Sequence, residues 1–187
     1  MSAEKPEIVA LDAQMLRQQL GDFARLLRDC VHAGANIGFV LPFEEADARF
    51  FWEAKVLPAL TGGSRALWAA VIDGRLAGTV QLDWGTPANQ PHRAEVTKLM
   101  VHPDFRRRGI ARHLMAHLER RVERLGRRLI TLDTRTGDMA EPLYASLGFV
   151  TAGQIPDFCL DPRENRLWPT TLMYKRLPTE RSHDGPI

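Results

Sequence analysis

The sequence predicts a mixed α/β fold, built as one domain over residues 1–177. The length of 187 residues suits a single domain. An antiparallel hairpin is expected at residues 66–72 and 76–84, because the Asp73-Gly74 pair between them is typical of a two-residue hairpin turn. Strands and helices then alternate, which favours a sheet flanked by helices. Residues 178–187 are polar with proline and glycine, and are expected to form a flexible tail.

The segment before the hairpin is expected to contain one strand and two helices. A short strand is predicted at residues 7–10, and Asp12 can cap a helix that runs to residue 31. The apolar residues of this helix recur at helical spacing: Leu16, Leu20, Phe23, Leu27 and Val31. Residues 34–38 form a glycine-containing loop. A second helix is predicted at residues 42–57, with an inner face made of Phe43, Ala46, Phe50, Ala54 and Leu57.

The segment after the hairpin alternates regularly between the two kinds of element. A strand at 94–101 leads through an arginine-rich turn into a helix at 109–125, which carries one apolar stripe. A strand at 128–134 and a helix at 139–147 follow. Strands near 149–155 and 171–177 complete the predicted sheet.

Composition and charge exclude several classes of protein. Hydrophobic residues at 44% and charged residues at 26% are typical of a soluble globular chain rather than a disordered one. No apolar run approaches the ~18 residues of a membrane-spanning helix, and the N-terminus lacks the apolar core of a secretory signal. Because no such apolar run is present, no membrane partner is expected. Cys30 and Cys159 match no metal-ligand spacing, and a reduced cytoplasm is the expected compartment. His113 and His117 lack an acidic ligand or a third histidine, so no metal is expected.

The turn at residues 106–111 is a candidate anion site. Its sequence, RRRGIA, lies between a predicted strand and a predicted helix. The first N–H groups of a helix have no internal partners, and small residues let a ligand approach the backbone. The turn can therefore bind a diphosphate, although a tight turn with solvated arginines is the alternative.

Two longer segments resemble the signatures of the GNAT acetyltransferase superfamily. The first is EVTKLMVHP at residues 95–103, followed by Arg106-x-x-Gly109-x-Ala111, and the second is LYASLGF at residues 143–149. The similarity covers residues 65–177. It implies a central, mostly antiparallel sheet of about six or seven strands with about four helices. It also implies an N-acetyltransferase that uses acetyl-CoA as acetyl donor and needs no metal.

A narrower resemblance concerns the subgroup that contains tabtoxin-resistance acetyltransferase. It is carried by VHAGANIGF at residues 31–39 and by LDTRTG at residues 132–137. The subgroup implies an amino-acid-like acceptor amine, bound with acetyl-CoA in a ternary complex for direct attack.

The resemblance implies a role for three side chains and one contiguous segment. Glu95 is expected to be the base that removes the proton of the amine, with Asp133 as a second carboxylate that binds the ammonium or shares that role. Tyr144 is expected to protonate the leaving thiolate. A backbone N–H at Leu99 would polarise the acetyl carbonyl. Acetyl-CoA is expected to contact Leu99, Met100, Val101, Arg106, Arg107, Arg108, Gly109, Ile110, Ala111 and Arg112.

The candidate residues of the acceptor pocket come from one loop and from two aromatic positions elsewhere in the chain. His32, Asn36 and Phe39 lie in the subgroup-like loop, and Trp84 and Phe158 are further aromatic candidates. Each of these side chains also suits ordinary structural packing. A blocked cleft would favour small molecules, whereas an open groove would favour peptides.

Three other functions stay open at this stage. One is acetylation of a protein lysine or N-terminus, and another is a non-catalytic acyl-CoA-binding module. The third is nucleic-acid binding by the nine arginines between residues 106 and 128. A net charge of +2 and the lack of interleaved aromatic residues argue against nucleic acid. A homodimer is an open alternative to a monomer, since an exposed C-terminal strand could pair with a second copy.

Overall fold

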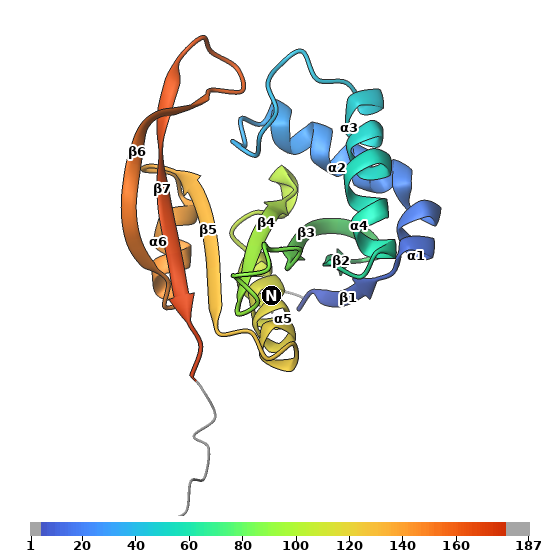
Figure 1. Ribbon diagram of the computed structural model, residues 1–187. Helices are drawn as coiled ribbons and strands as arrows, with labels where there is room; N and C mark the ends of the chain where they lie inside the picture. The colour runs from blue at the N-terminus through green and yellow to red at the C-terminus, as the bar shows by residue number, and fades with distance from the viewer. Residues whose placement is uncertain (1–4, 179–187) are drawn as a thin grey trace, which may run out of the picture.

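The computed structural model describes residues 5–178 and shows one seven-stranded sheet (Figure 1). The strand order is β1-β2-β3-β4-β5-β7-β6, and every neighbouring pair is antiparallel except β4 and β5. The strands are β1 (Glu7–Leu11), β2 (Arg65–Ile72), β3 (Arg75–Asp83), β4 (Arg93–Val101), β5 (Leu129–Arg135), β6 (Val150–Leu160) and β7 (Leu167–Arg176). The mixed, mostly antiparallel sheet is thereby confirmed. The predicted tail, apart from residue 178, lies outside the described residues.

Helices cover the sheet unevenly. The helical elements are α1 (Ala13–Gln18), α2 (Leu20–His32), α3 (Glu45–Phe51), the π-helical turn η1 (Trp52–Val56), α4 (Leu57–Thr61), the 3-10 turn η2 (Pro103–Phe105), α5 (Ile110–Arg124) and α6 (Ala140–Ser146). One core cluster joins α1–α4 to the sheet, and a second joins the sheet to α5 and α6. In Figure 1, α1–α4 lie beside the β1–β4 half of the sheet, and β6 and β7 stand apart from them.

The β2–β3 hairpin forms as predicted. Asp73 and Gly74 both have positive φ, at 49° and 71°. This pair of angles belongs to the type I′ turn, whose twist matches that of the two strands it joins. The hairpin holds β3 next to β4, the strand from which the site is built.

The first predicted helix is divided into two. Its apolar stripe is buried as expected, from Leu16 to Val31. However, Gln19 has φ −107° and ψ 13°, so α1 ends there and α2 begins at the next residue. The break involves Gln19 alone, and the apolar residues on both sides of it are buried in the same core cluster.

The second helix starts later than predicted, and its predicted inner face is only partly buried. Phe43 and Leu57 are buried as predicted, whereas Ala46, Phe50 and Ala54 are exposed. The helix begins at Glu45, where Glu44 and Asp47 form a capping box. Phe50 is 66% exposed, whereas Ala48, Trp52 and Val56 are buried. The π-helical turn η1 continues the helix, and Trp52 within it donates from Nε1 to the Phe23 carbonyl at 3.0 Å. A large aromatic residue with a buried hydrogen bond therefore sets the rotation of this segment.

The C-terminal hairpin is longer than predicted and largely uncovered. β6 pairs with β7 as the edge strand, and every residue of β6 except Cys159 is exposed. Apolar side chains such as Val150 and Phe158 therefore face solvent. The hairpin extends the sheet beyond the helices and forms one wall of the site described next.

Candidate active site

The site lies where two parallel strands separate. β4 and β5 pair in the described chain at Arg93–Leu129, Ala94–Ile130 and Glu95–Thr131, and beyond these residues they diverge. β4 also carries a bulge, because its register with β3 shifts between Thr79 and Gln81 and Lys98 has φ 52°. Lys98 and Leu99 have no partner residue in either strand register. The divergence and the bulge leave part of the β4 backbone free to bind another molecule.

One cavity, of about 610 Å³, lies between the start of α5 and α6. It is lined by Val101, Phe105, Arg106, Arg107, Gly109, Ile110, Ala111, Arg112, Met139, Ala140 and Leu143. Gly109 is the N-cap of α5 with φ 75°, a conformation that favours glycine. Within the described chain, the backbone N–H groups of residues 107–111 have no hydrogen-bond acceptor. Consecutive free donors at a helix N-terminus make an anion-binding site.

The arginines of this turn do not all take the same direction. Arg106, Arg107 and Arg112 line the cavity, and Arg112 donates to Ser146 Oγ at 2.9 Å. Arg108 instead lies over the Phe105 ring, 5.3 Å from its centroid, and donates to the Asp104 carbonyl. The structure thus brings most of the predicted cofactor residues together, and Arg108 is directed away from them.

Of the three β4 residues predicted to contact acetyl-CoA, Val101 lines this cavity and Leu99 and Met100 do not. The Val101 side chain lines the cavity, whereas Met100 is buried against α1–α4. Leu99 packs against the opposite core cluster. Any contact of Leu99 or Met100 with a ligand would therefore come from the peptide groups.

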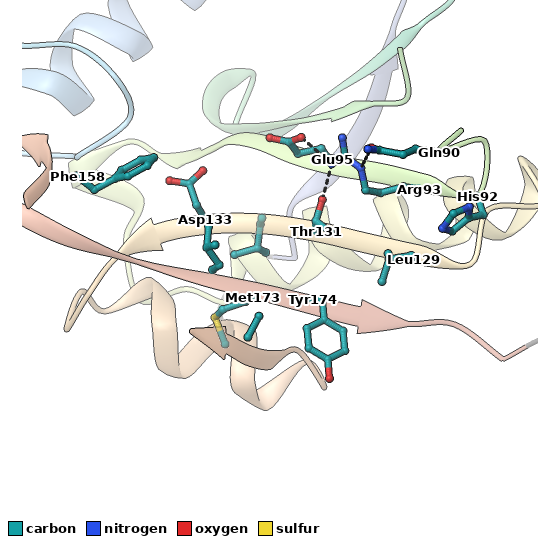
Figure 2. Close-up of a pocket in the computed structure, with 13 residues that line it drawn as sticks. Gln90, His92, Arg93, Glu95, Leu129, Thr131, Asp133, Phe158, Met173 and Tyr174 are labelled. Carbon is teal, nitrogen blue, oxygen red and sulfur yellow. Dashed lines mark hydrogen bonds and ion pairs between the residues drawn. The ribbon is translucent and has the colours of Figure 1, made fainter. Parts of the chain in front are cut away.

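A second cavity, of about 580 Å³, contains the two predicted carboxylates (Figure 2). It is lined by Gln90, His92, Arg93, Glu95, Leu129, Thr131, Leu132, Asp133, Ala152, Phe158, Leu172, Met173 and Tyr174. Glu95 accepts from Arg93 at 2.9 Å, and its side chain is 42% exposed. Arg93 also donates to Thr131 on β5, so this arginine ties the two strands together where they part. Asp133 accepts from Thr170 Oγ1 at 3.1 Å and is exposed on β5.

Tyr144 lies in the core and does not itself line either cavity. Its ring is 5.7 Å from that of Phe149, and the residue is 6% exposed. Burial raises the pKa of the Tyr144 phenol, and the charges of Asp133 and Asp138 raise it further. The phenol therefore keeps its proton at neutral pH, as a proton donor must. Its neighbour Leu143 lines the cavity at α5.

The loop that precedes α3 crosses to the C-terminal hairpin. Asn36 donates to Cys159 Sγ at 3.0 Å, and the Leu41 N–H donates to the Pro162 carbonyl at 2.8 Å. His32 is hydrogen bonded to the Phe43 carbonyl at 2.8 Å, a contact that holds the loop. Phe39 packs against Phe43 with ring centroids 4.7 Å apart. Thus the loop bridges the two halves of the sheet.

The turn between β6 and β7, which the loop contacts, is held by hydrogen bonds to Asp161. Asp161 is buried and accepts from the backbone of Arg163 and Glu164 and from Trp168 Nε1. These hydrogen bonds, the one from Arg163 first, lower the pKa of Asp161. The Asp161 carboxylate therefore stays charged at neutral pH. Asp161 was not among the predicted site residues, although an aspartate followed by proline is a turn signal.

Trp84 does not belong to this group. It packs against the second core cluster, and Arg121 of α5 lies 5.5 Å from its ring centroid. It lines neither cavity. Its role in the acceptor pocket stays a prediction, whereas Phe158 does line the cavity with the carboxylates.

Lys98 lies within the segment that resembles the family signature, and no contact with a ligand was predicted for it. Its ammonium donates to the Ile37 carbonyl at 2.6 Å and lies 5.2 Å from the centre of the Phe39 ring. Burial lowers the pKa of Lys98, the charge of Asp133 opposes that shift, and Arg65 adds to it. A lysine in a strand usually points to solvent, so the sequence pattern could not reveal this placement.

Two other features concern the described residues as a whole. No helix among them is long and apolar enough to cross a membrane. In the same residues, no group of three or more histidine, cysteine, aspartate or glutamate side chains is arranged to hold a metal ion.

Comparison with known proteins places this architecture. The sequence model of the acetyltransferase (GNAT) family matches residues 25–149. The fold is similar to that of yncA from Salmonella typhimurium, assigned as an acetyltransferase and solved with its cofactor acetyl-CoA, with TM-score 0.75, 18% identity, and coverage of 98% of this chain and 100% of that one.

Two further solved structures are named for their acceptors. One is the ribosomal-protein-alanine N-acetyltransferase of Brucella melitensis, with TM-score 0.71, 18% identity, and coverage of 91% of this chain and 99% of that one. The other is assigned as a phosphinothricin N-acetyltransferase, with TM-score 0.70, 16% identity, and coverage of 92% and 100%. At such identities the likeness concerns the fold, and these two names leave the acceptor of this chain open.

Proposed function

The chain belongs to the GNAT family of acetyltransferases, and from this premise we propose that it transfers acetyl from acetyl-CoA to a primary amine of a small, amino-acid-like molecule. The reaction would be a direct attack in a ternary complex. One observation carries this proposal: the cavity that contains both carboxylates lies where β4 and β5 part, and the cavity with free backbone donors lies at the end of the same strand β4.

The donor side has the chemistry that acetyl-CoA requires. The diphosphate would accept hydrogen bonds from the free N–H groups of residues 107–111, beside Arg106, Arg107 and Arg112. The pantetheine arm would continue along the unpaired backbone of β4, as an added strand does at a free edge. This arrangement would bring the thioester to the bulge at Leu99.

The acceptor side has groups for each proton that must move. Glu95, assisted by Asp133, would remove a proton from the ammonium of the acceptor. The neutral nitrogen then attacks the carbonyl carbon, and the Leu99 N–H stabilises the oxyanion that forms. The C–S bond breaks, Tyr144 protonates the thiolate, and the nitrogen loses its remaining extra proton to a carboxylate or water. Acetylated amine and CoA are the products.

The bridged loop favours a small acceptor over a protein. The contacts of Asn36 with Cys159 and of Leu41 with Pro162 join the walls of the cleft on one side. A peptide that runs through the cleft would need both contacts to open, whereas a small molecule would enter from the exposed side of β6. We further propose the cytoplasm as the compartment, where the free thiols of Cys30 and Cys159 would stay reduced.

The test is an acetylation assay with a mixed panel of acceptors. Purified protein and acetyl-CoA are incubated with amino acids, polyamines, amine antibiotics and lysine peptides, and new acetylated species are detected by mass spectrometry. Wild type is compared with Glu95→Gln and with Glu123→Gln, an exposed control on α5. We expect a small amine to be acetylated by wild type and by the control, and the Glu95 variant to be severely impaired.

Other outcomes would replace the proposal with a specific alternative. Preferential acetylation of lysine peptides would make the chain a protein acetyltransferase. Acetyl-CoA binding without any product across a broad panel would indicate a binding module, and full turnover by Glu95→Gln would remove the base from its assigned role.

A further inference from the structure

Lys98 is a partly buried cation on the strand that would present the thioester. It occupies the bulge of β4 with φ 52°. At a strand rise of about 3.3 Å per residue, it begins about 10 Å along β4 from Glu95. Two long side chains at that separation can reach the same ligand. Lys98 lies outside the lining of the carboxylate cavity, so it would meet a ligand that extends from Glu95 along β4.

The surroundings of the ammonium leave it incompletely paired. A lysine has three N–H donors, and one of them reaches the Ile37 carbonyl at 2.6 Å. The rings of Phe39 and Phe51 lie 5.2 Å and 5.6 Å away and attract the charge through their π faces. No ion pair between Lys98 and a carboxylate is found in the described part of the chain. Two donors and a positive charge are thus available to a ligand.

The local electrostatics favour an added anion. Burial lowers the pKa of Lys98, and the nearby charge of Arg65 lowers it further. Asp133, across the divergence from β4, is the carboxylate whose charge partly compensates. A buried charge without a direct partner is unfavourable, because it has lost water without gaining an ion pair. An anion beside the ammonium would relieve this deficit.

We propose that Lys98 is a specificity-determining residue, which binds an anionic group, such as a carboxylate, carried by the acceptor close to its reactive amine. This inference rests on the proposed function and narrows its substrate class to amines that also carry a negative charge. The anion would bind Lys98 under the loop at residues 34–41, and the amine of the same molecule would lie toward Glu95 and Asp133. A neutral or purely cationic amine would leave the ammonium unpaired.

The experiment compares acceptors that differ in this one charge. Each accepted amino acid is paired with its own carboxamide, and kcat/KM is measured for both with wild type, Lys98→Met and Lys98→Arg. We expect wild type to prefer the acid, and Lys98→Met to lose roughly 10- to 100-fold on the acid, as for a hydrogen bond to a charged group. The amide should change less than about threefold. Lys98→Arg should recover part of the preference.

Control variants separate recognition from support of the loop. Phe43→Leu loosens the packing of the same loop without removing a ring that lies against Lys98, and should affect acid and amide equally. Lys55→Met removes an exposed lysine from η1 and should change neither. Equal losses of acid and amide in Lys98→Met, with acetyl-CoA affinity retained, would overturn the proposal and leave Lys98 a residue that only holds the loop. Should Lys98→Met not fold, Lys98→Gln replaces it.

A binding measurement keeps this inference separate from the proposed function. Calorimetry of the CoA complex with an N-acetylated amino acid and with its amide needs no turnover. Tighter binding of the acid that depends on Lys98 supports the anion subsite even if the panel of amines gives no product. Equal binding of the two in wild type contradicts the subsite even if acetyl transfer is observed.

Discussion

The donor and acceptor sides of the cleft are built from the chain in different ways. The donor side is contiguous: the end of β4, the turn and the start of α5 lie within residues 101–112, joined by a few residues of α6. The acceptor side joins distant segments, as in the hydrogen bond from Asn36 to Cys159, which are 123 residues apart. Local sequence can therefore specify how a common acetyl donor is bound, whereas the choice of acceptor depends on tertiary contacts.

This difference suggests that the two sides can be altered separately. A change in the turn before α5 should affect every acceptor alike. A change in the loop or the β6–β7 turn should alter acceptor use at constant affinity for acetyl-CoA. The carboxylates at the junction should affect turnover itself.

The largest expected effect is at the junction. Glu95→Gln should lower kcat by about 10²–10⁴ for every acceptor, because a general base is lost, while acetyl-CoA affinity stays constant. Asp133→Asn should give a smaller loss. Raising the pH should relieve both losses, since more of the amine is already deprotonated. Steady-state kinetics between pH 6 and 10, with acetyl-CoA affinity measured by calorimetry, tests this. Glu95→Gln activity that stays low at every pH would point to a structural role for Glu95.

The donor side should respond next. Arg107→Gln and Arg112→Gln should each weaken acetyl-CoA binding by roughly 10- to 100-fold, the effect of one hydrogen bond between charged groups. Arg108→Gln is the matched control, because Arg108 packs on Phe105 and does not itself line the cavity. Titration calorimetry at two salt concentrations measures the affinities. An equal loss of affinity in Arg108→Gln would contradict the observed directions of these side chains. A changed order of preferred acceptors in Arg107→Gln or Arg112→Gln would contradict the separation of the donor and acceptor sides.

The smallest effect is expected from chemical modification of the two thiols. Cys30 contacts the donor side at Val101, and Cys159 contacts the acceptor side at Asn36. Cys30 is buried and donates to the Val101 carbonyl, and burial raises its pKa to about 12. Cys159 is partly exposed and contacts Asn36. At pH 8 a thiol reagent should modify Cys159 and leave Cys30 unmodified. Labelled protein should show a several-fold higher KM for the acceptor with unchanged acetyl-CoA affinity, as for loss of about 1 kcal/mol.

The raised pKa of Cys30 also gives a pH dependence with a defined sign. Its thiol is neutral in both folded and unfolded protein below about pH 8.5, the ordinary value for cysteine. Above that pH the unfolded chain ionises first, so this contribution to stability decreases as the pH rises toward about 12. Urea unfolding of wild type and Cys30→Ala at pH 7 and pH 10 tests this: the stability advantage of wild type should shrink at pH 10. An unchanged difference would contradict the buried, neutral thiol.

The sequence predicted those features that depend on short-range patterns. The Asp73-Gly74 turn, the stripe from Leu16 to Val31 and the turn before α5 each follow from spacing within a few residues, and each is found in the structure. The rotation of α3 was not predictable in this way, because Trp52 is fixed by a hydrogen bond to Phe23, 29 residues away.

The acceptor side was hardest to predict for the same reason. The role of Trp84 in packing depends on Arg121, and the partial burial of Lys98 depends on the loop at Ile37. Neither contact can be predicted from the local periodicity of the sequence. Glu95 and Asp133 do line one cavity. Residue spacing alone does not predict this, and the expectation came from the family resemblance, which places their two strands side by side.

The most direct test of this account is a crystal structure with CoA and the N-acetylated form of the acceptor that the panel identifies. The account predicts that the diphosphate contacts the N–H groups of residues 107–111 and that the CoA sulfur lies between β4 and β5. It also predicts that the acetylated nitrogen faces Glu95 and Asp133. A pantetheine arm outside the divergence of these strands, or a nitrogen away from both carboxylates, would contradict the central claim that the two cavities form one active site.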